Sequence, residues 1–306
     1  MQQDFDFVII GAGVAGLSAA QYAARANLKT AVIEANTNGG QALLINDLEN
    51  YPGIFPSING FDFIKTMQKQ AESFGATFFK GKVQSIDKYK ERFVIKTEKD
   101  DFCAKALLVA TGAKHRKLNI TGEEEFLGRG VSYCATCDGP FFRNKPMLVI
   151  GGGDAACDEA NFLSKLSDCV YLVHRRDTLK AQAKVAERVL NNPHIKPLFN
   201  KIPVKIEGNG KVEKVLLKDT KTGEETKVET AAVFVFVGME PQNELIEMAK
   251  KDENGYIITD ENMMTSIEGL FCAGDLRAKP FRQIVTAASD GAYAACGAEN
   301  YIQKIK

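Results

Sequence analysis

The chain has 306 residues, 45% of them hydrophobic, so it can bury a large core and is about twice the usual length of a single domain. Basic and acidic residues number 39 each, and a net charge of zero argues against nucleic acid or anionic lipid as a partner. Because no apolar run approaches membrane-spanning length and no basic signal-peptide flank precedes the first apolar run, we expect neither membrane insertion nor secretion.

A strand that runs into a glycine turn occurs twice along the chain, each time followed by an Ala-containing helix and another strand. The elements predicted first are strands over residues 5–10, 29–34 and 105–112, helices over 17–26 and 61–74, and an antiparallel hairpin that includes 93–97. After a connector over 114–145, the predicted elements are strands over 146–150, 169–174, 231–238, 255–259 and 269–275, and helices over 155–166 and 284–301.

The predicted fold class is therefore α/β, with two Rossmann-like, three-layer nucleotide-binding domains. We expect the second domain to be inserted into the first, with chain crossings near Ala113 and Gln242. The predicted boundaries give residues 1–113 and 243–306 to the first domain and 114–242 to the second.

The first glycine turn contains Gly11, Gly13 and Gly16, where small residues allow a tight turn and close approach of the backbone to a pyrophosphate. Glu34 ends the second strand, where a carboxylate can accept hydrogen bonds from ribose hydroxyls. An acid at that point suits FAD or NAD and disfavours a 2′-phosphate.

The far end of the chain favours FAD at this first site. Asp275 ends a strand-like segment, so its carboxylate can hold the hydroxyls of a ribityl chain at the carboxyl edge of the sheet. Arg282 and Gln283, just before the last helix, offer donors to a flavin. Taken alone, Asp275 is also compatible with an acid that stabilises a turn.

The second turn is a variant in which Ala156 replaces the final glycine. No acid ends its second strand. Instead, Arg175 and Arg176 follow His174 at the end of that strand. Guanidinium groups pair with phosphate in a bidentate manner, so these arginines suit the 2′-phosphate, and the expected cofactor is NADPH. Lys180 adds a nearby point charge. The alternative is a solvated strand end.

The string CATCD places two residues between Cys134 and Cys137, and Asp138 follows directly. This spacing fits a redox pair, half of a zinc site, or two packed thiols. Zinc needs about two more ligands, and the chain has three histidines and no second CxxC, so we expect no metal and favour the redox pair. Asp138 can exchange protons with a leaving thiolate, or can cap the local turn.

The remaining cysteines lie scattered in apolar segments, where thiols pack as small hydrophobic groups. They are Cys103, Cys157, Cys169, Cys272 and Cys296. This pattern is unlike a secreted disulfide framework and predicts a cytoplasmic protein.

Together these motifs resemble the low-molecular-weight thioredoxin reductases over essentially the whole chain. The matching strings, in chain order, are GAGVAG, GGQ with ENYPG, ATGA, GRGVSYCATCDG, GGGDAA, HRRD and AGDLRAKPFRQ. The resemblance implies FAD in the first domain, NADPH in the second, a Cys134–Cys137 disulfide reduced by the flavin, and a homodimer. Members often carry an arginine where this chain has Lys180.

The resemblance also implies the residues that bind each cofactor. For FAD they are Gly11, Ala12, Gly13, Ala15, Gly16, Glu34, Gly40, Gln41, Asn50, Ala110, Thr111, Gly112, Gly274, Asp275, Arg282, Gln283 and Ile284. For NADPH they are Gly152, Gly153, Asp154, Ala155, His174, Arg175, Arg176 and Lys180.

The activity implied is NADPH-dependent reduction of thioredoxin, with a large domain rotation between half-reactions. Cys137 would react with the reduced flavin, Cys134 would attack the thioredoxin disulfide, and Asp138 would donate a proton. Two alternatives remain at this stage: the same chemistry serving another dithiol protein, such as a peroxiredoxin system, and a flavoprotein that does not use thiols.

Overall fold

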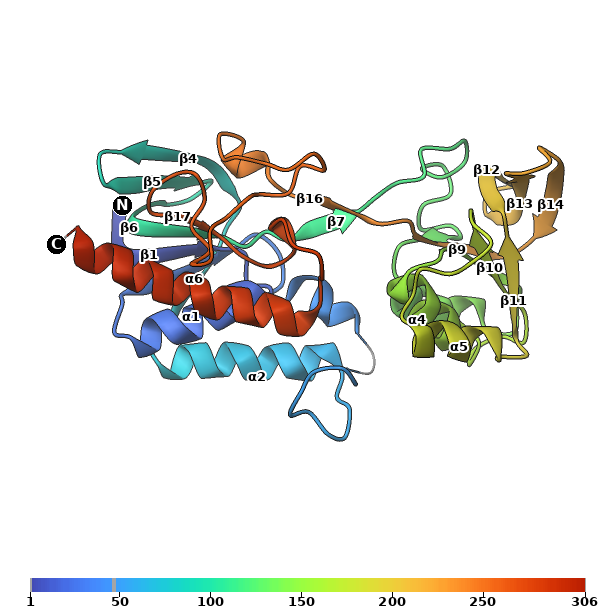
Figure 1. The fold of residues 1–306 in the computed structure, drawn as a ribbon, viewed down its shortest axis with the longest axis horizontal. Helices are drawn as coiled ribbons and strands as arrows, with labels where there is room; N and C mark the ends of the chain where they lie inside the picture. The colour runs from blue at the N-terminus through green and yellow to red at the C-terminus, as the bar shows by residue number, and fades with distance from the viewer. Residues whose placement is uncertain (1, 46–47, 306) are drawn as a thin grey trace. The chain divides into compact units, whose positions relative to one another are not determined.

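The computed structural model describes residues 2–45 and 48–305, and it divides the chain into two compact units (Figure 1). Unit 1 contains the residues up to Lys114 together with those from Glu240 onward, and unit 2 is the single segment His115–Met239. Each unit has its own sheets and its own hydrophobic clusters.

A mixed sheet of seven strands forms the centre of unit 1. Its strands are β3 (Thr77–Lys80), β2 (Thr30–Glu34), β1 (Gln2–Ile10), β6 (Asp101–Val109), β5 (Arg92–Thr97), β4 (Val83–Tyr89) and β17 (Leu270–Cys272). Strands β3, β2, β1, β6 and β17 run parallel, whereas β4 and β5 form an antiparallel hairpin. The first half of β6 pairs with β5 and its second half with β17, so the predicted hairpin extends the main sheet.

Strand β1 shows why this sheet is buried on both faces. Phe7 and Ile9 belong to one apolar cluster, and Val8 and Ile10 belong to the cluster on the opposite face. Side chains alternate between the faces of a strand, so an uninterrupted apolar run covers both.

The first of these clusters is covered by a layer of helices (Figure 1). The long helices of unit 1 are α1 (Val14–Arg25), α2 (Gly60–Ser73) and α6 (Ile284–Lys304), and its short 3-10 helices are η1 (Gly40–Leu44), η3 (Glu244–Ile246) and η4 (Gly274–Leu276). Helix α1 contacts both α2 and α6. A Cβ on Gly291 of α6 would lie 2.1 Å from the carbonyl oxygen of Ala15, so a glycine is needed where α6 crosses α1.

Unit 2 contains an entirely parallel sheet of five strands. Its order is β11 (Ile195–Phe199), β10 (Val170–His174), β9 (Met147–Gly151), β15 (Ala232–Phe236) and β8 (Val131–Ser132). The helices of unit 2 are α3 (Ala135–Asp138), η2 (Gly139–Phe142), α4 (Asp154–Leu163) and α5 (Ala183–Leu190). The α/β class predicted from the sequence, with two Rossmann-like halves, is confirmed.

A second, antiparallel sheet in unit 2 was not predicted from the sequence. It consists of β12 (Lys201–Gly208), β13 (Val212–Asp219) and β14 (Glu225–Glu229). The chain passes between the units through β7 (Ala113–His115) and β16 (Met239–Pro241), which pair with each other.

The prediction of a strand over residues 255–259 is wrong. Ile257 makes only isolated bridges, to Lys251 and Arg277. Side chains on either side close local turns: Asp252 accepts from the N–H groups of Asn254 and Tyr256, and Asp260 accepts from those of residues 262 and 264. These turns leave the apolar stretch too short to extend a ladder.

Within residues 2–45 and 48–305, no helix has the length and apolar character that crossing a bilayer requires.

Candidate active site

The first glycine turn connects β1 to α1 in unit 1. Gly11 has φ +102°, and a Cβ on Gly16 would lie 1.9 Å from the carbonyl oxygen of Gly11. These two glycines therefore allow the tight turn and the close packing of helix against strand. Gly13 differs, because a Cβ there would meet nothing within 4 Å, and it caps α1 without a side-chain hydrogen bond. The start of α1 therefore has open space beside Gly13, which suits a pyrophosphate.

Four neighbouring strands bring the other expected flavin residues to the same edge of this sheet. Strand β2 ends at Glu34, β1 runs into the glycine turn, β6 precedes Ala110, and β17 precedes Gly274. The carboxyl ends of parallel strands form the binding crevice in folds of this kind. Glu34 accepts hydrogen bonds from the N–H groups of Ala12 and Asn36, both at 2.8 Å, so its carboxylate is fixed beside the turn.

Hydrogen bonds join several of the residues assigned to FAD. Asn50 Nδ2 donates to Gln283 Oε1 at 3.1 Å, although the two are far apart in sequence. The Gly39 N–H donates to the carbonyl oxygen of Ala12 at 2.8 Å, which places the Gly39–Gly40 pair against the first turn. Gln41 Nε2 donates to the carbonyl oxygen of Ala113.

Thr111 has a partner that sequence analysis did not indicate. Its hydroxyl donates to the carbonyl oxygen of Gln242, and Gln242 Nε2 donates to the carbonyl oxygen of Thr111, both at 2.7 Å. The N–H of Gln242 also donates to the carbonyl oxygen of Gly112 at 3.0 Å. These bonds join the two chain segments of unit 1 beside β7 and β16.

Two buried polar atoms near the start of α6 have no hydrogen-bond partner within the described residues: Asp275 Oδ1 and Arg282 Nε. Burial raises the pKa of Asp275, and the cations Lys279 and Arg282 oppose that rise. The Arg282 guanidinium lies 3.7 Å from the ring centroid of Tyr256. Buried polar groups are normally satisfied, so an acceptor and a donor left open here fit a polar ligand such as a flavin with its ribityl chain.

The second glycine turn connects β9 to α4 in unit 2. A Cβ on Gly151 would lie 2.7 Å from Cβ of Ala156, which takes the position of the usual third glycine. A Cβ on Gly153 would meet nothing within 4 Å, and Gly153 caps α4 without a side-chain hydrogen bond. The N-terminus of α4 is therefore as open to a phosphate group as that of α1.

His174 lies under this turn. A Cβ on Gly152 would be only 2.3 Å from the buried ring of His174. Burial is the main cause that lowers the pKa of His174, and the charge of Arg176 lowers it further. Its Nε2 has no hydrogen-bond partner within the described residues. The neutral ring therefore supports the turn by packing.

The basic residues expected to bind a 2′-phosphate follow β10 directly. Arg175, Arg176 and Lys180 are all exposed, and the Lys180 N–H donates to the carbonyl oxygen of Gly152 at 2.6 Å. This bond holds the basic segment beside the glycine turn. Asp154 accepts from both the N–H and Nε2 of Gln182, at 2.7 and 2.9 Å, so its carboxylate has a structural role at the start of α4.

Cys134 and Cys137 form a disulfide at the two ends of the first turn of α3, with their Cα atoms 5.4 Å apart. The Cys134 N–H donates to Ser132 Oγ at 3.0 Å, and the Cys137 N–H donates to Cys134 Sγ at 3.2 Å. Cys137 is exposed, whereas Cys134 and Asp138 are half-buried. The two sulfurs bond to each other, as the redox interpretation of CATCD requires.

The disulfide and the second glycine turn lie at the same edge of one sheet. Strand β8 ends at Ser132, β9 ends at Gly151, and both run parallel to β15 between them. Their carboxyl ends therefore point the same way, and a nucleotide bound at the Gly152–Gly153 turn would share that edge with α3.

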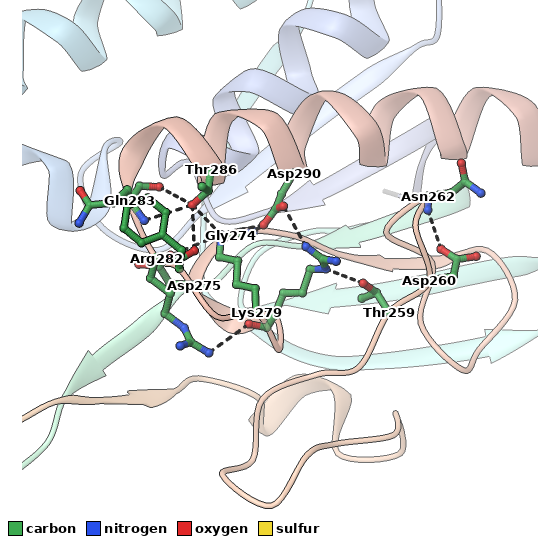
Figure 2. A network of polar contacts seen from close by, with 12 residues as sticks. Thr259, Asp260, Asn262, Gly274, Asp275, Lys279, Arg282, Gln283, Thr286 and Asp290 are labelled. Carbon is green, nitrogen blue, oxygen red and sulfur yellow. Dashed lines mark hydrogen bonds and ion pairs between the residues drawn. The ribbon is translucent and has the colours of Figure 1, made fainter. Parts of the chain in front are cut away.

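Sequence analysis missed a group of charged residues next to Asp275. Asp290 of α6 binds Arg277, Lys279 and the Gly274 N–H (Figure 2). Arg277 and Lys279 stand inside a quoted motif, but Asp290 lies in mid-helix and carries no local signal of this partnership.

Two dinucleotide-type turns and an internal disulfide in one chain define a disulfide oxidoreductase that works with nucleotides. The chain belongs to the pyridine nucleotide-disulphide oxidoreductase family, whose model matches residues 5–291. The resemblance to thioredoxin reductases is confirmed by curated relatives. The thioredoxin reductase of Treponema pallidum is 56% identical and that of Bacillus subtilis 44% identical, covering 100% and 99% of this chain and 100% and 96% of the relatives.

A solved structure agrees with these relatives. Thioredoxin reductase of Lactococcus lactis, in a form described as the FR conformation, matches with a TM-score of 0.95 and 43% identity, over 98% of this chain and 99% of that one. Membership of this family implies a flavin and a pyridine nucleotide as cofactors.

Proposed function

We propose that this chain is an NADPH-dependent thioredoxin reductase that carries FAD on unit 1 and NADPH on unit 2. The observation that carries the proposal is the Cys134–Cys137 disulfide, located at the strand edge that also presents the second glycine turn. The full-length relatives that bear the same enzyme name support it.

The assignment of FAD to unit 1 rests on open positions at the edge of its sheet. Gly13 leaves room for a pyrophosphate, Glu34 is placed for a ribose, and Asp275 and Arg282 have buried polar atoms without a hydrogen-bond partner among residues 2–45 and 48–305. The assignment of NADPH to unit 2 rests on Gly153, which is similarly open, and on exposed Arg175 and Arg176 beside its turn.

The overall reaction consumes NADPH, a proton and an oxidised dithiol protein, and yields NADP⁺ and the reduced dithiol. A flavin held at the strand edge of unit 1 would supply the hydride and electron-pair chemistry that a disulfide cannot perform alone. The electron pair enters the Cys134–Cys137 bond, which breaks to leave a thiol and a thiolate.

The cysteines then exchange with the substrate. A Cys134 thiolate attacks one sulfur of the substrate disulfide, forming a mixed disulfide and releasing the other substrate sulfur as a thiolate. Cys137 attacks Cys134 Sγ next, which restores the internal disulfide and releases the second substrate sulfur. Asp138, one residue from Cys137, is proposed to supply the proton that the leaving thiolate needs.

We further propose a cytoplasmic homodimer whose substrate partner is thioredoxin. Exposed aromatic side chains come from each helix of the layer in unit 1: Tyr22, Phe61 and Tyr293 are 44%, 57% and 57% exposed. Aromatic side chains of this kind favour an interface between copies of the chain.

An anaerobic titration of the purified protein with NADPH tests the enzyme function. Flavin absorbance should bleach, two new thiols per chain should appear, and the reduced protein should then reduce oxidised thioredoxin. NADH, glutaredoxin-type and peroxiredoxin-type proteins serve as comparison reagents. Flavin reduction without new thiols would refute the dithiol relay, and turnover with only a different dithiol protein would change the substrate assignment.

A further inference from the structure

A buried carboxylate in the middle of α6 organises the turn that carries Asp275 (Figure 2). Asp290 Oδ2 accepts hydrogen bonds from the Gly274 N–H at 3.1 Å and from Lys279 Nζ at 2.8 Å, and Oδ1 accepts one from Arg277 Nη1 at 3.1 Å. Its side chain is only 8% exposed, and that of Lys279 only 6%. Contacts between buried charges are strong and are costly to break on one side.

The turn that Asp290 holds has little freedom to move. Gly274 has φ +75°, and a Cβ there would lie 2.9 Å from Cβ of Ala15 in α1. Arg277 is itself fixed, because its Nε donates to Thr259 Oγ1 at 2.6 Å. The position of Asp275, which follows Gly274 directly, thus depends on the contacts of Asp290.

Lys279 lies between two carboxylates at unequal distances. Its Nζ is 2.8 Å from Asp290 Oδ2 but 3.7 Å from Asp275 Oδ1, and it also donates to Thr286 Oγ1 at 3.3 Å. At 3.7 Å the ammonium group offsets part of the charge of Asp275 without making a hydrogen bond to it. Oδ1 of Asp275 therefore remains buried and without a hydrogen-bond partner in the described chain.

We propose that Asp290 is a positioning residue for flavin binding: it holds the Gly274 N–H and the Lys279 ammonium, and so presents Asp275 with one carboxylate oxygen open to a ligand hydroxyl. This inference rests on the proposed binding of FAD to unit 1. Without the charge of Asp290, Lys279 would move to the nearest remaining carboxylate and bind the oxygen that the ligand needs.

Release of FAD from the holoprotein after dilution, followed by flavin fluorescence, tests the proposal. Asp290→Asn should release FAD about 10- to 100-fold faster, the range expected for weakening one hydrogen bond to a charged group. Asp6→Asn is the matched control, because Asp6 likewise accepts from a lysine, Lys105 at 2.7 Å, and from a backbone N–H, that of Lys29 at 3.0 Å. The control should lower thermal stability without changing the release rate.

A double-mutant cycle separates positioning from general loss of structure. If Asp290 acts through Asp275, then adding Asp290→Asn to Asp275→Asn should change FAD release less than about threefold, whereas independent effects would multiply. Full multiplication, or an unchanged release rate in Asp290→Asn, would overturn the proposal.

A second pair of variants covers the case in which Asp290→Asn does not fold. Lys279→Gln removes the ammonium group that offsets the charge of buried Asp275, so it should speed FAD release, and Lys105→Gln, its counterpart in the control pair, should not. Equal release from these two variants would also overturn the proposal.

The outcome in the wild-type protein separates this inference from the proposed function. If the wild-type protein binds no FAD, the proposed cofactor is wrong. If the wild-type protein binds FAD and Asp290→Asn has no effect on its release, only this inference is removed.

Discussion

The backbone N–H of Cys137 points at the sulfur of Cys134, with the nitrogen and sulfur 3.2 Å apart. An N–H at the start of a helix stabilises a thiolate in the position that Cys134 occupies. The same amide cannot serve Cys137, so the two sulfurs are chemically distinct even though they share one disulfide.

This asymmetry gives the cysteines different expected phenotypes. Cys137→Ser should leave NADPH-dependent bleaching of the flavin intact and lower thioredoxin reduction by about a thousandfold or more, because the internal disulfide cannot form. Stopped-flow absorbance and a coupled turnover assay measure the two steps. Cys296→Ser, which changes an exposed cysteine of α6, should behave like the wild type in both assays. Normal turnover by Cys137→Ser would remove the relay.

The basic segment after β10 should determine the choice of nicotinamide cofactor. Replacing both Arg175 and Arg176 with Ala should raise KM for NADPH about 10- to 100-fold and leave KM for NADH nearly unchanged, since only NADPH carries the 2′-phosphate. Steady-state kinetics with both donors measures this ratio. Arg188→Ala, an exposed change on α5, is the control. Equal effects on the two donors would contradict the assignment.

The two glycines that cap α1 and α4 offer a reciprocal test of the cofactor assignment. Gly13 and Gly153 have backbone angles that alanine adopts readily, and a Cβ at either meets no protein atom within 4 Å. Gly13→Ala should weaken FAD binding about 10- to 100-fold and spare NADPH, because the methyl group would enter the space kept for the pyrophosphate. Gly153→Ala should do the reverse.

Thermal unfolding of the two apoproteins should match that of the wild type, which would show that the ligand and not the fold is affected. If either variant weakens both cofactors equally, the separation of the two sites onto two units is wrong.

Glu159 of α4 should make stability depend on pH. Burial, followed by the charge of Asp158, raises the pKa of Glu159 from 4.5 to about 7, and its Oε2 is buried without a hydrogen-bond partner in the described chain. Between these two values the folded chain keeps a proton that the unfolded chain has lost. Stability contributed by this group is therefore present at low pH and is lost as pH rises to about 7.

Glu159→Gln should accordingly unfold with a free energy about 1–3 kcal/mol higher than wild type above neutral pH. The gain should vanish in mildly acidic solution, below the ordinary pKa of 4.5. Denaturant unfolding at several pH values measures this difference. Glu187→Gln, on the exposed side of α5, is the control. A gain for Glu159→Gln that is the same at every pH would rule out the titration of Glu159 as its cause.

Sequence reasoning worked best where a local pattern has one physical meaning. The segments 5–10 and 146–150 each end in a glycine turn, and both form strands followed by helices, β1–α1 and β9–α4. The turns need glycines for reasons that act over a few residues, such as the 1.9 Å approach that a Cβ on Gly16 would make. CATCD is likewise a local signal, and its two sulfurs are bonded in the structure.

Features that depend on distant packing were not predicted. Strands β12, β13 and β14 are rich in Lys and Glu and have only one apolar face, so their sequence resembles solvated loops until Ile206, Val215 and Leu217 meet in one cluster. Asp290 was missed because its role requires η4 to pack against α6. Ile257 was assigned to a strand because its apolar neighbours outweighed the turn residues on both sides.

The reciprocal hydrogen bonds between Thr111 and Gln242 have a practical consequence for protein engineering. The segment His115–Met239 leaves and rejoins the rest of the chain through the paired strands β7 and β16. A short loop could therefore replace this segment, because the two chain ends that it would connect in unit 1 are already joined by these hydrogen bonds. The excised segment carries its own sheets and the disulfide, and its two termini would emerge next to each other. The binding of each cofactor could then be studied on a separate polypeptide.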